Sequence, residues 1–179
     1  SHILAKGAGK VREAYKHRIV SERLTGKPLE SYVNPHMARG TEQEAYARME
    51  YEAETGNIVY EVGFLLHPEL RAGASPDGLI DADGGLEIKA VIPTVQVETI
   101  ERGGYPVKHK GQIQGGMWVT GRAWWDFCSY SPDMPDGLRL YIFRVGRDEE
   151  YIANLEAEVR KFLSEVDELE QQMRAKNGI

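Results

Sequence analysis

The hydrophobic period of the chain changes along its length, and this change restricts the fold more than any other feature. Apolar residues recur at helical spacing over 9–25 and 35–55, which predicts two helices. The period then shortens, and β-branched and aromatic residues predict strands over 58–66, 71–80, 85–92, 123–130 and 138–145. Further helices are predicted over 93–102, 107–120 and 149–176. Helices before, between and after the strands predict an α/β fold with a mixed central β-sheet flanked by helices.

Apolar stripes predict which helix faces are buried. The first helix carries Val11, Tyr15, Ile19 and Leu24 near one stripe, and the second carries Ala38, Ala45, Met49 and Ala53. The stripe of the last helix is longer and steps by three or four through Ile152, Leu155, Val159, Phe162, Val166, Leu169 and Met173. We expect each of these faces to pack against the rest of the protein.

The size and composition of the chain exclude several classes of protein. Its 179 residues have the usual size of one domain, so we expect residues 1–179 to form a single domain. No apolar run approaches the roughly 18 residues of a membrane helix, and the N-terminus lacks a signal-peptide core, which predicts a cytoplasmic protein without a membrane partner. Cys128 is the only cysteine, which excludes internal disulfides, zinc ribbons and four-cysteine iron–sulfur clusters.

Charge is distributed unevenly between the two ends of the chain. The net charge is −6, yet residues 1–30 hold seven Lys or Arg against three Glu, and residues 148–179 hold nine acids against four bases. A basic end suits contact with phosphates, and Arg12, Lys16 and Arg23 are candidates for contacts to a DNA backbone. The alternative is two amphipathic helices whose solvent faces differ in charge.

The segment from Ser75 to Lys89 is the best candidate for chemistry. The turn sequence at 81–85, with its Asp-Gly pair, predicts a hairpin that folds Asp77 back beside the next strand. Strand alternation places Glu87 and Lys89 on one face and directs Ile88 into the core. Two carboxylates among apolar strand residues need a counter-charge, and Mg²⁺ suits a site with few carboxylates and several waters. The alternative is an exposed hairpin with an ordinary charge pair.

Other polar and aromatic residues have both a functional and a structural interpretation. Glu44 lies on the second predicted helix, where an acid could reach the same carboxylates, although most glutamates there are expected to coat a solvated face. Gln112 and a second glutamine lie among apolar residues and need hydrogen-bond partners if buried. The histidines lack zinc spacing, and the tryptophans are expected in the core more often than as platforms for bases.

Four motifs in register resemble one known family. They are GASPDG at 73–78, GLEIK at 85–89, QIQGGMWVT at 112–120 and DFCSYSPDM at 126–134. Together they resemble the phage lambda exonuclease or YqaJ-type viral recombinase nuclease family, which has the PD-(D/E)xK restriction-endonuclease-like fold. The resemblance extends over about residues 4–165.

The resemblance implies a role for each matching residue. It assigns Asp77, Glu87 and the Ile88 carbonyl as ligands of Mg²⁺, for which the family is expected to accept Mn²⁺, and Glu44 as a ligand directly or through water. Lys89 is implied to orient or deprotonate the attacking water. Two further residues complete the implied site: Gln112, which would fix Lys89 or the nucleophile, and Ser75, which would contact the 5′-phosphate.

The same resemblance implies an activity and its partners. We expect a Mg²⁺-dependent 5′-to-3′ exonuclease on double-stranded DNA ends, assembled as a homotrimeric ring, with a single-strand annealing protein as recombination partner, in a bacterial host and of phage or prophage origin. The alternatives are another PD-(D/E)xK DNA nuclease of the RecB or restriction type, and a non-catalytic DNA-binding module with a degenerate site. Intact Asp77, Glu87 and Lys89 argue against the last of these.

Overall fold

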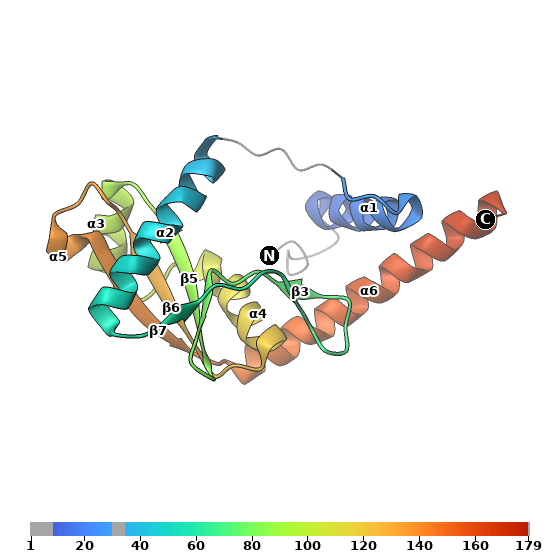
Figure 1. The fold of residues 1–179 in the computed structure, drawn as a ribbon. Helices are drawn as coiled ribbons and strands as arrows, with labels where there is room; N and C mark the ends of the chain where they lie inside the picture. Colours follow the sequence, from blue (N-terminus) through green and yellow to red (C-terminus); the bar gives the residue numbers. More distant parts are fainter. Residues whose placement is uncertain (1–8, 30–34, 179) are drawn as a thin grey trace. The chain divides into compact units, whose positions relative to one another are not determined.

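The computed structural model describes residues 9–29 and 35–178, which lie in two compact units (Figure 1). One unit holds the helices α1 (Lys10–Thr25) and α6 (Glu149–Asn177). The other unit extends from Val33 to Asp148 and holds all of the strands. No described helix combines the length and the apolar character that crossing a membrane requires.

The sheet of the second unit has five strands in the order β1-β4-β5-β6-β7. Their bounds are β1 (Val59–Tyr60), β4 (Gly78–Ile80), β5 (Gly84–Ala90), β6 (Trp124–Tyr130) and β7 (Leu140–Gly146). β5 and β6 are parallel, whereas the other neighbours are antiparallel. The crossover between the parallel pair contains α3 (Pro93–Arg102), the 3₁₀ turn η1 (Val107–His109) and α4 (Lys110–Thr120). The predicted mixed sheet flanked by helices is therefore confirmed.

Two of the predicted strands are wrong as continuous elements. Residues 58–66 contain β1 and then β2 (Leu65–Leu66), and residues 71–80 contain β3 (Gly73–Ala74) and then β4. β2 and β3 pair with each other in a separate two-stranded sheet. Composition indicates extended backbone in these segments, but it does not show that each segment is divided between two sheets. The loop predicted after β6 also contains a short helix, α5 (Asp136–Arg139).

The β4–β5 hairpin forms as predicted, with one difference in its turn. Ile80 pairs with Gly84, so the turn consists of the three residues between them. The positive φ of 45° falls on Asp81 and not on the glycine of the Asp-Gly pair, which already belongs to β5. Asp is among the few residues with a side chain that tolerate this conformation, so the turn forms without glycine at that position.

Helix α2 (Pro35–Thr55) covers one face of the sheet, with a different side inward from the one predicted (Figure 1). Ala47 and Tyr51 are fully buried in a cluster that includes Ile80, Leu86, Ile88 and Cys128. Ala45, Met49 and Ala53 are exposed, so the predicted stripe was wrong, and Ala38 lies outside the described side chains. The alanines fit either side of a helix, and the large Tyr51 ring determines which side gains more from burial.

Helix α4 packs on the opposite face, where tryptophan and glycine fit together. An added Cβ on Gly85 of β5 or on Gly116 of α4 would lie 2.4 or 2.9 Å from the Trp125 ring. Trp118, Trp125 and Tyr130 are buried, which confirms their interpretation as core residues. Glu87 and Lys89 follow Gly85 at alternate positions of β5, so both belong to this face.

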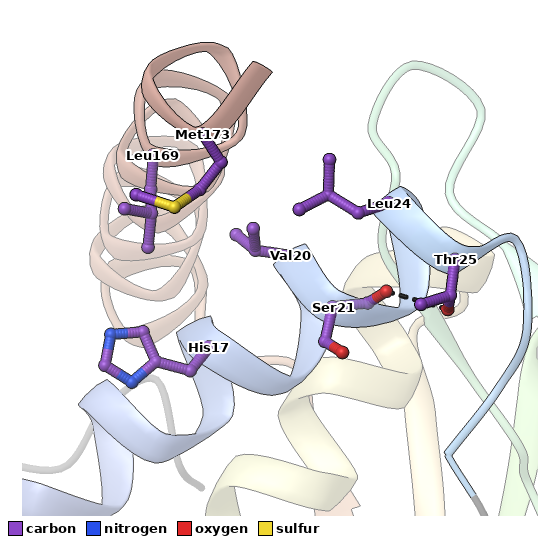
Figure 2. Close-up of a pocket in the computed structure, with 7 residues that line it drawn as sticks. All are labelled: His17, Val20, Ser21, Leu24, Thr25, Leu169 and Met173. Carbon is purple, nitrogen blue, oxygen red and sulfur yellow. Dashed lines mark hydrogen bonds between the residues drawn. The ribbon is translucent and has the colours of Figure 1, made fainter. Parts of the chain in front are cut away.

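The first unit is a pairing of α1 and α6 around Val20, Phe162 and Val166. The predicted α6 stripe is confirmed, because Ile152, Leu155, Val159, Phe162 and Val166 are all buried. In α1 the prediction for Val11 was wrong: its side chain is 54% exposed, while the neighbouring Arg12 is buried. Leu169 and Met173 line a pocket of about 350 Å³ together with α1 residues (Figure 2).

Candidate functional site

The β4–β5 hairpin places the Asp77 carboxylate beside the middle of β5. Asp77 immediately precedes β4, and its backbone N–H donates to the carbonyl of Leu86 over 3.2 Å. The Asp77 side chain accepts a 2.6 Å hydrogen bond at Oδ2 from the backbone N–H of Ile88. Within a strand, the N–H and the C=O of one residue point to the same edge. The Ile88 carbonyl therefore lies on the edge that Asp77 occupies, as the predicted ligand set requires.

Glu87 lies next to this edge and carries an under-compensated charge. It is 2% exposed, and its Oε1 forms an ion pair with the Lys89 ammonium. Burial and, next, the Asp77 carboxylate raise the pKa of Glu87 from 4.5 to about 7, against the opposing effect of Lys89. A buried carboxylate without full pairing is costly, so Glu87 has unmet demand for positive charge.

Helix α2 brings one further carboxylate and one cation to the same place. Burial and then the nearby Asp77 raise the pKa of Glu44, while Lys89 and Arg48 oppose the shift. Burial likewise raises the pKa of Asp77, with the Ile88 N–H, Lys89 and Arg48 opposing it. The structure thus brings together all four predicted charged residues of the centre. It adds Arg48, which lies one helical turn after Glu44.

The oxygen atoms of this centre fit a hard divalent cation. Within residues 9–29 and 35–178, no three His, Cys, Asp or Glu side chains come together as ligands of one ion, so Glu44 is near the centre without completing such a cluster. Two carboxylates and one carbonyl remain, which is the kind of partial ligand set that Mg²⁺ completes with waters. The raised pKa values of Glu87 and Asp77 show that Lys89 and Arg48 do not fully offset the cost of holding these acids here.

The side chains of Gln112 and Ser75, the two remaining residues of the predicted site, are both exposed. Gln112 lies on the exposed side of α4. Gln114 is the buried glutamine, and it donates to the Gly146 carbonyl over 2.9 Å and accepts from the Asp148 N–H over 2.9 Å. Ser75 lies between β3 and Asp77. The functions of Gln112 and Ser75 stay predictions.

His109 lies near the centre, although the spacing of the histidines in the sequence does not predict it to be a ligand. Its ring stacks on Phe127 with centroids 5.7 Å apart, and Phe127 pairs in register with Glu87. Burial and, next, the charges of Lys89 and Lys108 lower the pKa of His109 to about 4. A neutral imidazole therefore faces the same side of the sheet as Lys89. Its position in a lysine-rich turn carries no sequence signal for this.

The basic residues predicted to contact DNA form ion pairs within the α1–α6 unit. Arg12 binds Glu165 with both terminal nitrogens, at 2.5 and 3.0 Å, and lies over the Phe162 ring. Arg23 lies 2.5 Å from Asp167, and Lys16 lies 3.0 Å from Glu13 on the same helix. These basic residues of α1 therefore take part in ion pairs, and those of Arg12 and Arg23 join α1 to α6. Contacts of these residues with DNA stay a prediction.

Comparison with known proteins gives one family and two informative structures. The sequence profile of the YqaJ-like viral recombinase domain matches residues 7–123. The alkaline exonuclease LHK-Exo from Laribacter hongkongensis is 38% identical, with a TM-score of 0.90 over 99% of this chain and 89% of that chain. The same enzyme in complex with dAMP matches at 39% identity, a TM-score of 0.90 and the same coverage.

A more distant structure is similar in fold alone. A phage-related exonuclease from Haemophilus somnus 129PT is 13% identical, with a TM-score of 0.70 over 92% of this chain and 85% of that chain. No curated protein sequence shows significant similarity.

Proposed function

The chain belongs to the YqaJ-like viral recombinase domain family, and from this membership we propose that it is a divalent-metal-dependent exonuclease that degrades double-stranded DNA from 5′ to 3′. Family and structural similarity identify a nuclease of the phage recombination type. The proposal adds the metal, the polarity and the duplex substrate. Its biological role is to prepare DNA for homologous recombination by single-strand annealing.

The observation that carries the proposal is the arrangement of Asp77, Glu87 and Lys89 on one hairpin. Asp77 is held at the β5 edge by the Ile88 N–H, while Glu87 is buried and forms an ion pair with Lys89. A degenerate binding module has no need for a buried Glu87 carboxylate whose pKa is raised by burial and by the neighbouring Asp77. A catalytic centre retains such a group because its negative charge binds a cation.

The residues of the centre divide the chemistry among them. Mg²⁺ or Mn²⁺ held by Asp77, Glu87 and the Ile88 carbonyl supplies, when bound, Lewis-acid polarisation of a phosphate and a lower pKa for water. Lys89 Nζ orients the attacking water or accepts its proton, for in-line attack on the scissile phosphorus. Glu44 supports the cation directly or through water, and Gln112 fixes Lys89 or the nucleophile.

The DNA end is proposed to be held at the exposed side of the same centre. Ser75 precedes Asp77 by two residues, which keeps their Cα atoms within about 7 Å of each other, and we assign its hydroxyl to donate to a 5′-phosphate. The complex of the related exonuclease with dAMP supports a site that accepts a single nucleotide, the product expected of stepwise digestion. Arg12, Lys16 and Arg23 are retained as candidate backbone contacts.

The assembly is also part of the proposal. The family profile extends from α1 into the sheet unit, which supports a single nuclease domain across residues 1–179. We propose that three copies form a ring that encloses DNA and works with a single-strand annealing protein, in the cytoplasm of a bacterial host. Sedimentation showing a 20.1 kDa species at micromolar concentration would contradict the ring.

A digestion assay tests the activity. Linear duplexes with 5′-phosphate or 5′-hydroxyl ends, labelled at either the 5′ or the 3′ terminus, are incubated with Mg²⁺, with Mn²⁺ or with EDTA. We expect mononucleotide release from linear DNA only with metal, label loss from the 5′ end first, and intact circular DNA. Asp77→Asn serves as the inactive control. Digestion in EDTA, or cleavage of closed circular DNA, would overturn the proposal.

A further inference from the structure

Arg48 is a cation of the site for which neither the motifs nor the proposed chemistry gives a function. It lies on α2 one turn after Glu44, and its side chain is only 15% exposed. Its Nη1 lies 2.5 Å from Oε1 of Glu61, whose side chain is 74% exposed. The guanidinium is therefore nearly buried, whereas the acid that neutralises it reaches into solvent.

The hydrogen bonding of Arg48 is incomplete. Its Nε is buried and has no hydrogen-bond partner among the described residues. A guanidinium presents several donors in a fork that matches the oxygens of a carboxylate or a phosphate in pairs. The contact with Glu61 uses one terminal nitrogen, so Arg48 retains donors for a second oxygen.

Arg48 also lies within electrostatic reach of the acidic centre. Its charge acts on both Asp77 and Glu44, although its ion pair is made with Glu61. A cluster of carboxylates repels the phosphates of an approaching DNA strand, and a neighbouring fixed cation reduces this repulsion. The Glu61 side chain of this pair lies largely in solvent, so its contact with Arg48 contributes little to stability and a better anion can displace it.

We propose that Arg48 binds a phosphate of the DNA beside the carboxylate centre, and that Glu61 occupies the place of this phosphate in the DNA-free protein. The proposal rests on the proposed function, because it takes DNA as the ligand. The phosphate belongs either to the 5′ terminus or to an internal phosphodiester. Both present the same oxygens to the guanidinium, and the test below distinguishes them.

The two side chains of the pair are expected to affect DNA binding in opposite directions. Removal of Arg48 loses one phosphate contact, whereas removal of the Glu61 charge frees the guanidinium for phosphate. The alternative is that the ion pair only stabilises the packing of α2 against the loop after β1, which predicts a different effect of Glu61→Gln on DNA binding. In that case Glu61→Gln weakens binding, or leaves it unchanged, together with Arg48→Gln.

Equilibrium binding in Ca²⁺, with cleavage in Mg²⁺ measured in parallel, tests the proposal. Duplexes with a 5′-phosphate and with a 5′-hydroxyl are titrated with the parental protein, Arg48→Gln, Arg48→Lys and Glu61→Gln. The matched control is Arg160→Gln, which removes an arginine paired with Glu156 within α6. Thermal unfolding of every variant shows whether its fold is retained, and Glu61→Gln keeps the test valid if Arg48→Gln does not fold.

We expect Arg48→Gln to weaken binding about tenfold and to reduce the salt slope by about one unit, as loss of one phosphate contact requires. Arg48→Lys is expected to be intermediate, Glu61→Gln to bind more tightly than the parent, and Arg160→Gln to match it. A loss confined to the 5′-phosphorylated duplex assigns the terminal phosphate, and an equal loss on both assigns a phosphodiester. A parent that cleaves DNA while Arg48→Gln binds with parental affinity, or Glu61→Gln binds no more tightly, overturns this inference alone. A parent that neither binds nor cleaves DNA overturns the proposed function.

Discussion

Replacing Glu87 by glutamine is expected to stabilise the metal-free protein at neutral pH, although it removes a charged residue from an ion pair. The carboxylate is 2% exposed and lies near Asp77. Glutamine has nearly the same shape and no charge. The substitution therefore removes the cost of burying the charge while the packing of β5 is retained.

The magnitude follows from the pKa of Glu87, which rises from 4.5 to about 7 on folding. Each pKa unit corresponds to about 1.4 kcal/mol, so the ionised side chain destabilises the fold by about 3 kcal/mol. Because the folded-state pKa is raised, the folded protein binds more protons than the unfolded chain between pH 4.5 and 7. The contribution of this group to stability is complete below pH 4.5 and is lost as the pH rises through 7.

Urea unfolding in EDTA at pH values from 5 to 8 measures this effect. The free energy of unfolding of Glu87→Gln should exceed that of the parent by up to about 3 kcal/mol at pH 8, and the difference should shrink towards pH 5. Glu101→Gln, at an exposed position on α3, is the control and should show no such trend. Saturating Ca²⁺ should raise the stability of the parent at pH 8 more than that of Glu87→Gln. A difference that is independent of pH, or a less stable Glu87→Gln at pH 8, would refute the reasoning.

Three further substitutions test other parts of the structure. Lys89→Met should leave the protein folded in EDTA at reduced stability, because its buried acidic partner loses its counter-charge, and should abolish most cleavage in Mg²⁺; parental turnover would contradict its assigned role. Gly85→Ala should lower the free energy of unfolding by about 1–3 kcal/mol, because the new Cβ would meet the Trp125 ring at 2.4 Å; chemical denaturation measures this, and a neutral result would show that the ring yields. Tyr51→Phe removes a 2.6 Å hydrogen bond to the buried Asp126 carboxylate and should cost about 1–3 kcal/mol in the same assay.

The local geometry of the site could be read from the sequence because it depends on short-range rules. Side chains alternate along a strand, so Glu87 and Lys89 share one face of β5 and Ile88 lies on the other. Helix ends were equally local: α1 and α4 end at Gly26 and Gly121, both in the left-handed conformation. The relative placement of Glu87 and Lys89 could therefore be predicted from the sequence, whereas the roles of the site residues stay predictions.

The contact between Arg48 and Glu61 could not be predicted from local sequence rules. The position of Arg48 one turn after Glu44 follows from the helical repeat and could have been predicted. Its partner Glu61 lies in the segment after β1, and this contact depends on where that segment runs after leaving the sheet. Sequence spacing carries no information about such a path, so the charge balance around the carboxylates appears only in the structure.

Which face of a helix is buried was also decided by tertiary contacts. On α2, small residues fit either side, and the sheet selected Ala47 and Tyr51 over the predicted stripe. On α1, Arg12 is buried in place of Val11, because Glu165 on α6 neutralises the guanidinium and Phe162 packs against it. Periodicity defines which residues share a face, since it is a property of the backbone. Which face is buried depends on partners distant in sequence, and only the folded chain brings those partners into contact.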